Sequence, residues 1–281
     1  MEPHAIDATT RNKELELGAW LRERRSVLVG YSGGVDSTFL AVIAREVLGR
    51  DNTLAVLGRS DSVPAEQASR AEAIAEERDI ALRVVATGEL ADPRYAANPV
   101  NRCYFCKTVL WEVLAPMAHE YGIEVVVDGT NADDAGEYRP GAQAAREHGV
   151  ESPLAFVGLT KSEIRLLSRE RGLATWSQPS APCLASRIPY GFAVTSERLS
   201  QVERAEQSLR ALGIEGDLRV RHHGDVARIE MDPGVIDTWL DAQNARRLVD
   251  AVRQAGFPRV TVDLRGFRSG SLNVLEGVVA A

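Results

Sequence analysis

A short apolar run leads directly into a glycine-rich turn at Val27-Leu-Val-Gly-Tyr31 and Ser32-Gly-Gly-Val-Asp-Ser37. The apolar run predicts a buried β-strand, and the residues from Thr38 to Leu48 predict a helix that ends at Gly49. In such a strand-turn-helix unit, backbone amides converge at the N-terminus of the helix, where the glycines let an anion approach closely. The stretch therefore predicts a phosphate-binding loop.

This loop differs from a Walker A motif because no lysine follows its glycines. Transfer of a γ-phosphate, as in kinases and GTPases, is therefore not indicated. The hydroxyls of Ser32 and Ser37 add hydrogen-bond donors beside the backbone amides. The alternative is a glycine-rich turn with a purely structural role, which the flanking strand and helix disfavour.

Residues 1–175 alternate β-branched runs with longer helical patterns, as is typical of βαβ units on a parallel sheet. We expect further strands at 54–58, 82–86 and 124–127, and further helices at 64–78, 104–121 and 160–171. The last of these begins with a capping box at Thr160-Lys-Ser-Glu163. The alternation predicts an α/β domain with a doubly wound parallel sheet over residues 1–175.

Residues 176–281 follow a different pattern and predict a smaller α+β domain. The stretch from Trp176 to Tyr190 contains three prolines, so we expect an ordered connecting loop rather than a helix. Beyond it, the pattern predicts helices at 196–212 and 235–255 and strands at 218–222, 226–231 and 260–264. His223-Gly-Asp225 lies between the first two strands and predicts a hairpin.

The composition is that of a folded chain without a strong preference for polyanions. Of the 281 residues, 44% are hydrophobic, which disfavours intrinsic disorder. The 40 acidic residues outnumber the 33 basic residues, so no overall basic field favours nucleic acid or an anionic membrane. No apolar run has the length of a membrane span, and the first 13 residues lack an apolar signal core, so we expect a cytoplasmic protein.

Three cysteines stand in the chain, and an odd number this small does not make a disulfide framework. Cys103 and Cys106 are three residues apart at the start of a predicted helix, so both thiols lie on one face. The helix N-terminus there favours the thiolate form. Cys183 lies in the proline-rich loop, far away in the sequence.

The sequence Ser-Gly-Gly-Val-Asp-Ser after the first strand resembles the PP-loop of the ATP pyrophosphatases, which adenylate an oxygen of the substrate and release pyrophosphate. The resemblance implies that this loop holds the pyrophosphate end of ATP, that Asp36 acts through Mg²⁺, and that adenosine binds beside Arg59. The segment Asp128–Asp134 ends the fourth strand at the sheet edge where open α/β folds bind ligands, although one of its aspartates can cap the following helix. The residues expected to bind ATP are Ser32, Gly33, Gly34, Asp36, Ser37, Arg59, Ser60, Gly129, Thr130 and Asp134.

A narrower resemblance rests on Asn101-Arg-Cys-Tyr-Phe-Cys-Lys107, Pro182-Cys-Leu-Ala-Ser-Arg-Ile-Pro-Tyr-Gly191 and Arg219-Val-Arg221. Over nearly the whole chain, the sequence resembles the LarE family, the ATP-dependent sulfur transferases of nickel-pincer cofactor biosynthesis. The resemblance implies that carboxylates of pyridinium-3,5-biscarboxylic acid mononucleotide are adenylated and then converted to thiocarboxylates. It also implies assembly as a homo-oligomer.

The substrate would carry phosphate and carboxylate groups, which planar guanidinium groups bind well. Arg219 and Arg221 are two residues apart on a predicted strand, so both point to one face, although an ordinary surface ion pair is the alternative for each. Glu206 and Glu230 resemble acidic residues that face the family's site and bind a cation; the alternative is a solvated surface charge. The residues expected to bind substrate are Ser186, Arg187, Arg219, Arg221, Glu206 and Glu230.

The cysteines suggest the sulfur source. In some members of the family the cysteine equivalent to Cys183 is the only one, and it gives up its own sulfur. Here three thiolates can hold a 4Fe-4S cluster with one iron free to bind sulfide, so Cys103, Cys106 and Cys183 are the expected catalytic and metal-binding residues. The alternatives are a zinc site completed by His222 or His223, a redox disulfide beside a sacrificial Cys183, and a structural role for all three.

Two other functions compete with this interpretation. A PP-loop tRNA thiolase also combines ATP with clustered cysteines, but it needs a basic surface, and the acidic balance argues against one outside Arg22, Arg24 and Arg25. An ATP-binding protein without turnover is the other alternative. We therefore expect a small-molecule substrate and no nucleic-acid partner.

Overall fold

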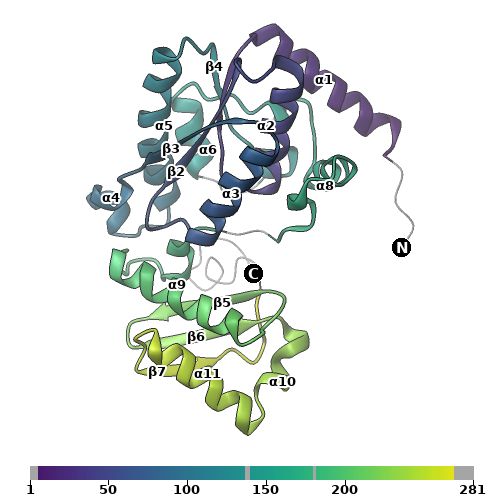
Figure 1. The fold of residues 1–281 in the computed structure, drawn as a ribbon. Helices are drawn as coiled ribbons and strands as arrows, with labels where there is room; N and C mark the ends of the chain where they lie inside the picture. The colour runs from purple at the N-terminus through teal and green to yellow at the C-terminus, as the bar shows by residue number, and fades with distance from the viewer. Residues whose placement is uncertain (1–5, 137–139, 180–181, 269–281) are drawn as a thin grey trace. The chain divides into compact units, whose positions relative to one another are not determined.

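The computed structural model describes residues 6–136, 140–179 and 182–268, which form two compact units (Figure 1). The second unit takes up one short segment from the middle of the chain, which no sequence pattern indicated. The division after residue 181 lies close to the boundary expected after residue 175. The first unit comprises Met1–Glu89 and Asn101–Ala181, and the second comprises Leu90–Val100 and Pro182–Ala281.

The first unit is built on a parallel four-stranded sheet in the order β3-β2-β1-β4. Val27 on β1 is level with Thr53 on β2 and with Val125 on β4. The strand order reverses at β1, which places the turn after β1 at the point where open α/β sheets bind ligands. The strands are β1 (Val27–Gly30), β2 (Thr53–Arg59), β3 (Ala81–Ala86) and β4 (Val125–Val127).

Helices cover both faces of this sheet, as Figure 1 shows. Val27 and Val29 pack in one apolar cluster with side chains from α1, α2, α3 and α8. Leu28, between them, packs in the other cluster with side chains from α5 and α6. This alternation confirms the α/β class. The helices are α1 (Ala8–Arg24), α2 (Val35–Leu48), α3 (Ala65–Glu77), α5 (Arg102–Glu120), α6 (Pro140–Glu147), α7 (Pro153–Phe156) and α8 (Lys161–Glu170), with short 3₁₀ turns η1 (Glu89–Ala91), η2 (Ala132–Gly136) and η3 (Ala174–Ser177).

Of two capped helix N-termini in the first unit, the sequence predicted one and not the other. Helix α8 has the expected capping box, because Thr160 and Glu163 each accept a hydrogen bond from the other's backbone N–H. Helix α1 was not expected, although Asp7 caps it by accepting from the backbone of Thr10. Among the described residues, no helix combines the length and the apolar character needed to cross a membrane.

The second unit contains a three-stranded sheet in the order β5-β6-β7, with β5 antiparallel and β7 parallel to β6. The prediction of one helix over 235–255 is wrong. Asp241 accepts hydrogen bonds from the backbone of Gln243 and Asn244 and so starts a new helix. The elements are α4 (Pro93–Ala96), η4 (Leu184–Arg187), α9 (Ser196–Ala211), β5 (Leu218–His223), β6 (Val226–Met231), η5 (Pro233–Val235), α10 (Ile236–Trp239), α11 (Ala242–Gln254) and β7 (Arg259–Val262).

Asn98 fastens the segment Leu90–Val100 into this second unit. Its buried side-chain amide donates to the carbonyls of Pro189 at 2.8 Å and Phe192 at 2.9 Å, and more weakly to that of Ile188 at 3.3 Å. Its backbone has φ +55°, a left-handed conformation that asparagine tolerates better than most residues. The loop after η4 is therefore held from a distant part of the chain.

Candidate functional site

The turn between β1 and α2 lies at the N-terminus of α2 in the first unit, and its binding of an anion stays a prediction. Ser32 Oγ lies 3.0 Å from Ser37 Oγ, and the backbone amide of Gly34 donates to Ser32 Oγ at 3.4 Å. Gly33 has φ +71°, and a Cβ placed there would lie 2.4 Å from Cβ of Ala71 on α3. Glycine is thus required at position 33 both by backbone conformation and by the close approach of α3.

Lys161 brings a positive charge to this loop that the sequence analysis did not foresee. Its Nζ lies 2.6 Å from Asp36 Oδ2, and Asp133 Oδ2 accepts from its backbone N–H at 2.8 Å. The other Asp36 oxygen, Oδ1, is buried and accepts no hydrogen bond from the described residues. The lysine that the PP-loop lacks in sequence therefore comes from the start of α8, 125 residues away.

The segment after β4 packs directly on the loop. A Cβ at Gly129 would lie 2.9 Å from the backbone nitrogen of Ser37, so only glycine allows this approach. Asp128 accepts hydrogen bonds from Thr130 and from Ser152 Oγ, and Asp134 accepts from the backbone of Asn131. These aspartates shape the segment, while nucleotide binding by Gly129, Thr130 and Asp134 stays a prediction.

Arg59 and Ser60 lie at the end of β2, one strand away from the loop. Arg59 pairs with Glu72 on α3, and Ser60 Oγ donates to the buried carboxylate of Glu89. Their expected contact with adenosine stays a prediction.

The cysteines belong to different units. Cys103 is exposed and Cys106 partly exposed on the first turns of α5, whereas Cys183 precedes η4 in the second unit. None of the three forms a disulfide bond within the described residues. Within the described residues, no group of three or more His, Cys, Asp or Glu side chains is gathered as a metal ion would require.

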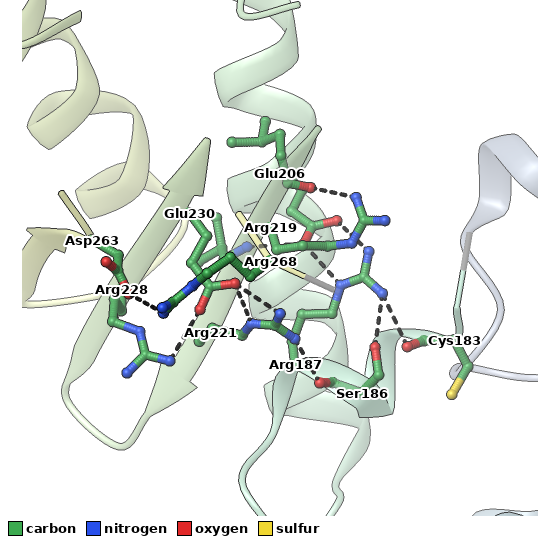
Figure 2. Close-up of polar contacts among 12 residues, drawn as sticks. Cys183, Ser186, Arg187, Glu206, Arg219, Arg221, Arg228, Glu230, Asp263 and Arg268 are labelled. Atoms are coloured by element: carbon green, nitrogen blue, oxygen red, sulfur yellow. Dashed lines mark hydrogen bonds and ion pairs between the residues drawn. The ribbon is translucent and has the colours of Figure 1, made fainter. Parts of the chain in front are cut away.

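In the second unit, arginines and glutamates that are buried or partly buried form a charged network around the Cys183 loop (Figure 2). Arg219 and Arg221 on β5 face Glu230 and Arg228 on the paired strand β6. We call the six residues the arginine cluster: Arg187, Arg219, Arg221, Arg228, Glu206 and Glu230.

Each glutamate of the arginine cluster holds at least one guanidinium. Glu206 binds Arg187 with both carboxylate oxygens, at 2.9 and 3.0 Å. Glu230, which is 1% exposed, pairs with Arg221 at 2.7 Å and with Arg228 at 3.0 Å. In this structure the cations that the two glutamates bind are therefore arginine side chains, and binding of a metal cation by them stays a prediction.

The cluster carries four guanidinium groups against two carboxylates. Burial, with the nearby charge of Arg187, lowers the pKa of Arg219 to about 10. Arg219 thus stays charged at neutral pH, but its cation is poorly solvated. An anion placed on this cluster would be stabilised by both effects.

Comparison with known proteins places these features in a family. A family model for NAD synthase matches residues 17–92, which include the PP-loop. The pyridinium-3,5-bisthiocarboxylic acid mononucleotide synthase of Lactiplantibacillus plantarum is 36% identical over 266 residues, which cover 95% of each chain. The chain belongs to the LarE family. The resemblance found in the sequence motifs is thereby confirmed.

Other relatives of this LarE family member differ in what their names state. An uncharacterized protein of Synechocystis sp. is 46% identical over 246 residues, covering 88% of this chain and 91% of that protein. A GMP synthase (glutamine-hydrolyzing) of Aeropyrum pernix is 27% identical over 83% of this chain and 54% of its own. The similarity to the L. plantarum synthase covers 95% of this chain and so spans both units.

Proposed function

We propose that this LarE family member is an ATP-dependent sulfur transferase. It adenylates the carboxylates of pyridinium-3,5-biscarboxylic acid mononucleotide, releases pyrophosphate and converts the carboxylates to thiocarboxylates. The observation that carries the proposal is the similarity to the L. plantarum synthase over 95% of both chains. A carboxylate is a poor electrophile, and adenylation supplies the leaving group that a sulfur nucleophile needs.

The first unit supports the adenylation step. The amides at the start of α2, with Ser32 and Ser37, suit the phosphates of ATP, and Lys161 adds a cation beside them. Asp36 is the residue that would hold Mg²⁺, since its Oδ1 is buried without a hydrogen-bond partner among the described residues. The ion would neutralise phosphate charge during release of pyrophosphate.

The arginine cluster supports binding of an anionic substrate in the second unit. Arg219 and Arg221 share one face of β5 and are both less than a tenth exposed, so their charges are weakly screened. We assign the phosphate and carboxylate groups of the mononucleotide to these two side chains. This assignment needs no basic surface elsewhere, in agreement with the net charge of −7.

For the sulfur source we propose a 4Fe-4S cluster held by Cys103, Cys106 and Cys183. The exposure of Cys103 and the partial exposure of Cys106, three residues apart at the start of α5, suit such ligands. When bound, the cluster would supply an iron site for sulfide. Three further points also stay predictions: that the protein is cytoplasmic, that it forms a homo-oligomer, and that it has no nucleic-acid partner.

The test is a reaction of the purified full chain with Mg²⁺-ATP, sulfide and the pyridinium mononucleotide. We expect pyrophosphate release that depends on the mononucleotide, and a product whose mass shows oxygen replaced by sulfur. Release stimulated by tRNA instead would identify a tRNA thiolase and contradict the proposal.

The source of sulfur needs a separate measurement. Protein purified without oxygen should be brown, with broad visible absorption. An unchanged intact mass after turnover is expected for sulfide carried on a cluster, whereas loss of H₂S from Cys183 would show that this residue is the donor. A colourless protein with full activity would contradict the cluster.

A further inference from the structure

Arg187 holds the backbone around Cys183. Its Nη1 donates to the carbonyl oxygens of Pro182 at 2.6 Å and of Cys183 at 3.1 Å, and to Ser186 Oγ at 3.0 Å. Figure 2 shows the Cys183 carbonyl directed at Arg187 while the sulfur points away. The guanidinium therefore fixes the two peptide groups that flank the Cys183 Cα.

Glu206 fixes Arg187 in turn. Its carboxylate accepts hydrogen bonds from Nε and Nη2 of Arg187. Its Oε1 also accepts from the backbone N–H of Val220 on β5 at 2.9 Å. Because Arg187 is 4% exposed, this ion pair has little competition from water. All three guanidinium nitrogens of Arg187 already donate within the unit, so its position is fixed from several sides.

A second arginine, Arg221 on β5, binds the η4 turn at Ser186. Arg221 Nη1 donates to the carbonyl of Ser186 at 3.0 Å, while its Nε donates to Glu230 at 2.9 Å. Two arginine–glutamate pairs thus connect η4 to β5, α9 and β6. Three carbonyls of this loop are therefore bound by buried guanidinium groups.

We infer that Glu206 and Arg187 are positioning residues that set the direction of the Cys183 thiol. Glu206 lies on α9, accepts a hydrogen bond from β5, and orients the guanidinium of Arg187. Arg187 in turn holds the peptide groups on either side of Cys183. The inference rests on the proposed function for the step that Cys183 serves. It gives Arg187 a role different from the substrate contact expected from the sequence.

The test uses the full chain with Arg187→Lys and Glu206→Gln. Lysine keeps the charge but cannot bind Glu206 with two nitrogens while donating to two carbonyls. Glutamine retains Oε1 for Arg187 Nε and Val220, so it loosens the pair with less risk to folding. The matched control is Arg165→Lys, because Arg165 also donates to two loop carbonyls, those of Trp176 and Gln178, but lies in the first unit.

Two readouts separate this inference from the proposed function. Amide hydrogen exchange of the peptide covering 183–192 needs no activity; in Arg187→Lys it should rise about tenfold or more, as expected when a charge-assisted hydrogen bond is lost. Thiocarboxylate formed per pyrophosphate released should fall about 10²-fold, the scale expected for a reacting group misplaced by about 1 Å. Glu206→Gln should give smaller changes in the same direction, and Arg165→Lys should leave both readouts unchanged.

Three results would overturn the inference. Unchanged exchange at 183–192 in both variants would show that the pair does not hold the loop. A raised KM for the mononucleotide with unchanged kcat would make Arg187 a substrate ligand. A parallel fall of pyrophosphate release and sulfur transfer would indicate general damage to the fold. If the wild type itself forms no thiocarboxylate, the proposed function fails while the exchange measurement still tests the pair.

Discussion

At the scale of single residues, Lys161 is the side chain from outside the PP-loop that brings a positive charge to it, through its ion pair with Asp36. Lys161→Met should lower ATP-dependent pyrophosphate release about 10²- to 10³-fold, the usual loss when one preorganised cationic or hydrogen-bonding group leaves a phosphate site. Lys13→Met is the control, because Lys13 also forms an ion pair, with Glu163, but does not touch Asp36. Equal rates for the two variants would contradict the assignment.

Gly33 offers a second test at the same scale. Gly33→Ala forces a side chain into a left-handed backbone and against Ala71, so we expect the free energy of unfolding to fall by about 1–3 kcal/mol and ATP binding to weaken. Gly34→Ala is matched to it, since its nearest neighbour would be Ser32 Oγ at 3.4 Å. Denaturant unfolding and calorimetric ATP binding measure both effects, and similar losses in the two variants would refute the steric argument.

Local patterns predicted some of the candidate site but not its long-range contacts. The glycines and serines of the PP-loop were identifiable because strand, turn and helix are consecutive in the chain. Lys161 was missed because its contact with Asp36 joins residues 125 positions apart, and no periodicity records such a pair. The partner of Glu206, Arg187, lies 19 positions away. Those of Glu230 are only two and nine positions away, and its pair with Arg221 depends on the strand register of the hairpin, which the sequence pattern did not specify.

At the scale of elements, the strands were predicted best. β1 to β4 lie within one or two residues of their expected bounds, because each is a short run rich in Val, Leu or Ala. Helix α1 was missed because its apolar positions, such as Leu17 and Leu21, are few among charged residues. The break at Asp241 was missed because a capping aspartate inside an amphipathic pattern resembles an ordinary polar position.

We expect the stability of the protein to depend on pH through His222 on strand β5. This side chain is 3% exposed, packs edge-on against Phe257, and burial lowers its pKa below the usual value of 6.5. The unfolded state then binds the proton more tightly, so the stability that neutral His222 contributes is complete above about pH 6.5 and is lost as the pH falls through the lower folded value.

The measurement is calorimetric unfolding at about pH 7.5 and pH 5.5. The wild type should lose more stability on acidification than His222→Gln, which cannot titrate there. Gln201, whose Oε1 lies 3.1 Å from His222 Nε2, stays in place in both proteins. An identical pH dependence of the two proteins would show that His222 does not stay neutral on folding.

At the scale of the whole molecule, the second unit depends on a segment from the middle of the chain. Asn98→Ala removes the amide that binds the carbonyls of Pro189 and Phe192, and it leaves alanine in a left-handed backbone. We expect the second unit to lose about 2–4 kcal/mol of stability, from buried carbonyls without donors. Asn98→Gly keeps the backbone freedom, so the hydrogen bonds account for whatever loss it retains.

Hydrogen exchange resolved by peptide checks this prediction. Protection should fall at 184–194 and on β5, while β1 and β2 keep theirs. Equal loss in both units would mean that Asn98 stabilises the chain as a whole rather than the second unit.

The same segment has a consequence for synthesis of the protein on the ribosome. Asn98 emerges 94 residues before its partner Phe192, and at about 5–20 residues per second that interval lasts about 5–20 s. During this time Tyr95, which ends 1% exposed, has no completed unit to enter. The nascent chain must therefore carry an unburied aromatic segment through the whole translation of α5 to α8, and slower translation there lengthens its exposure to chaperones and proteases.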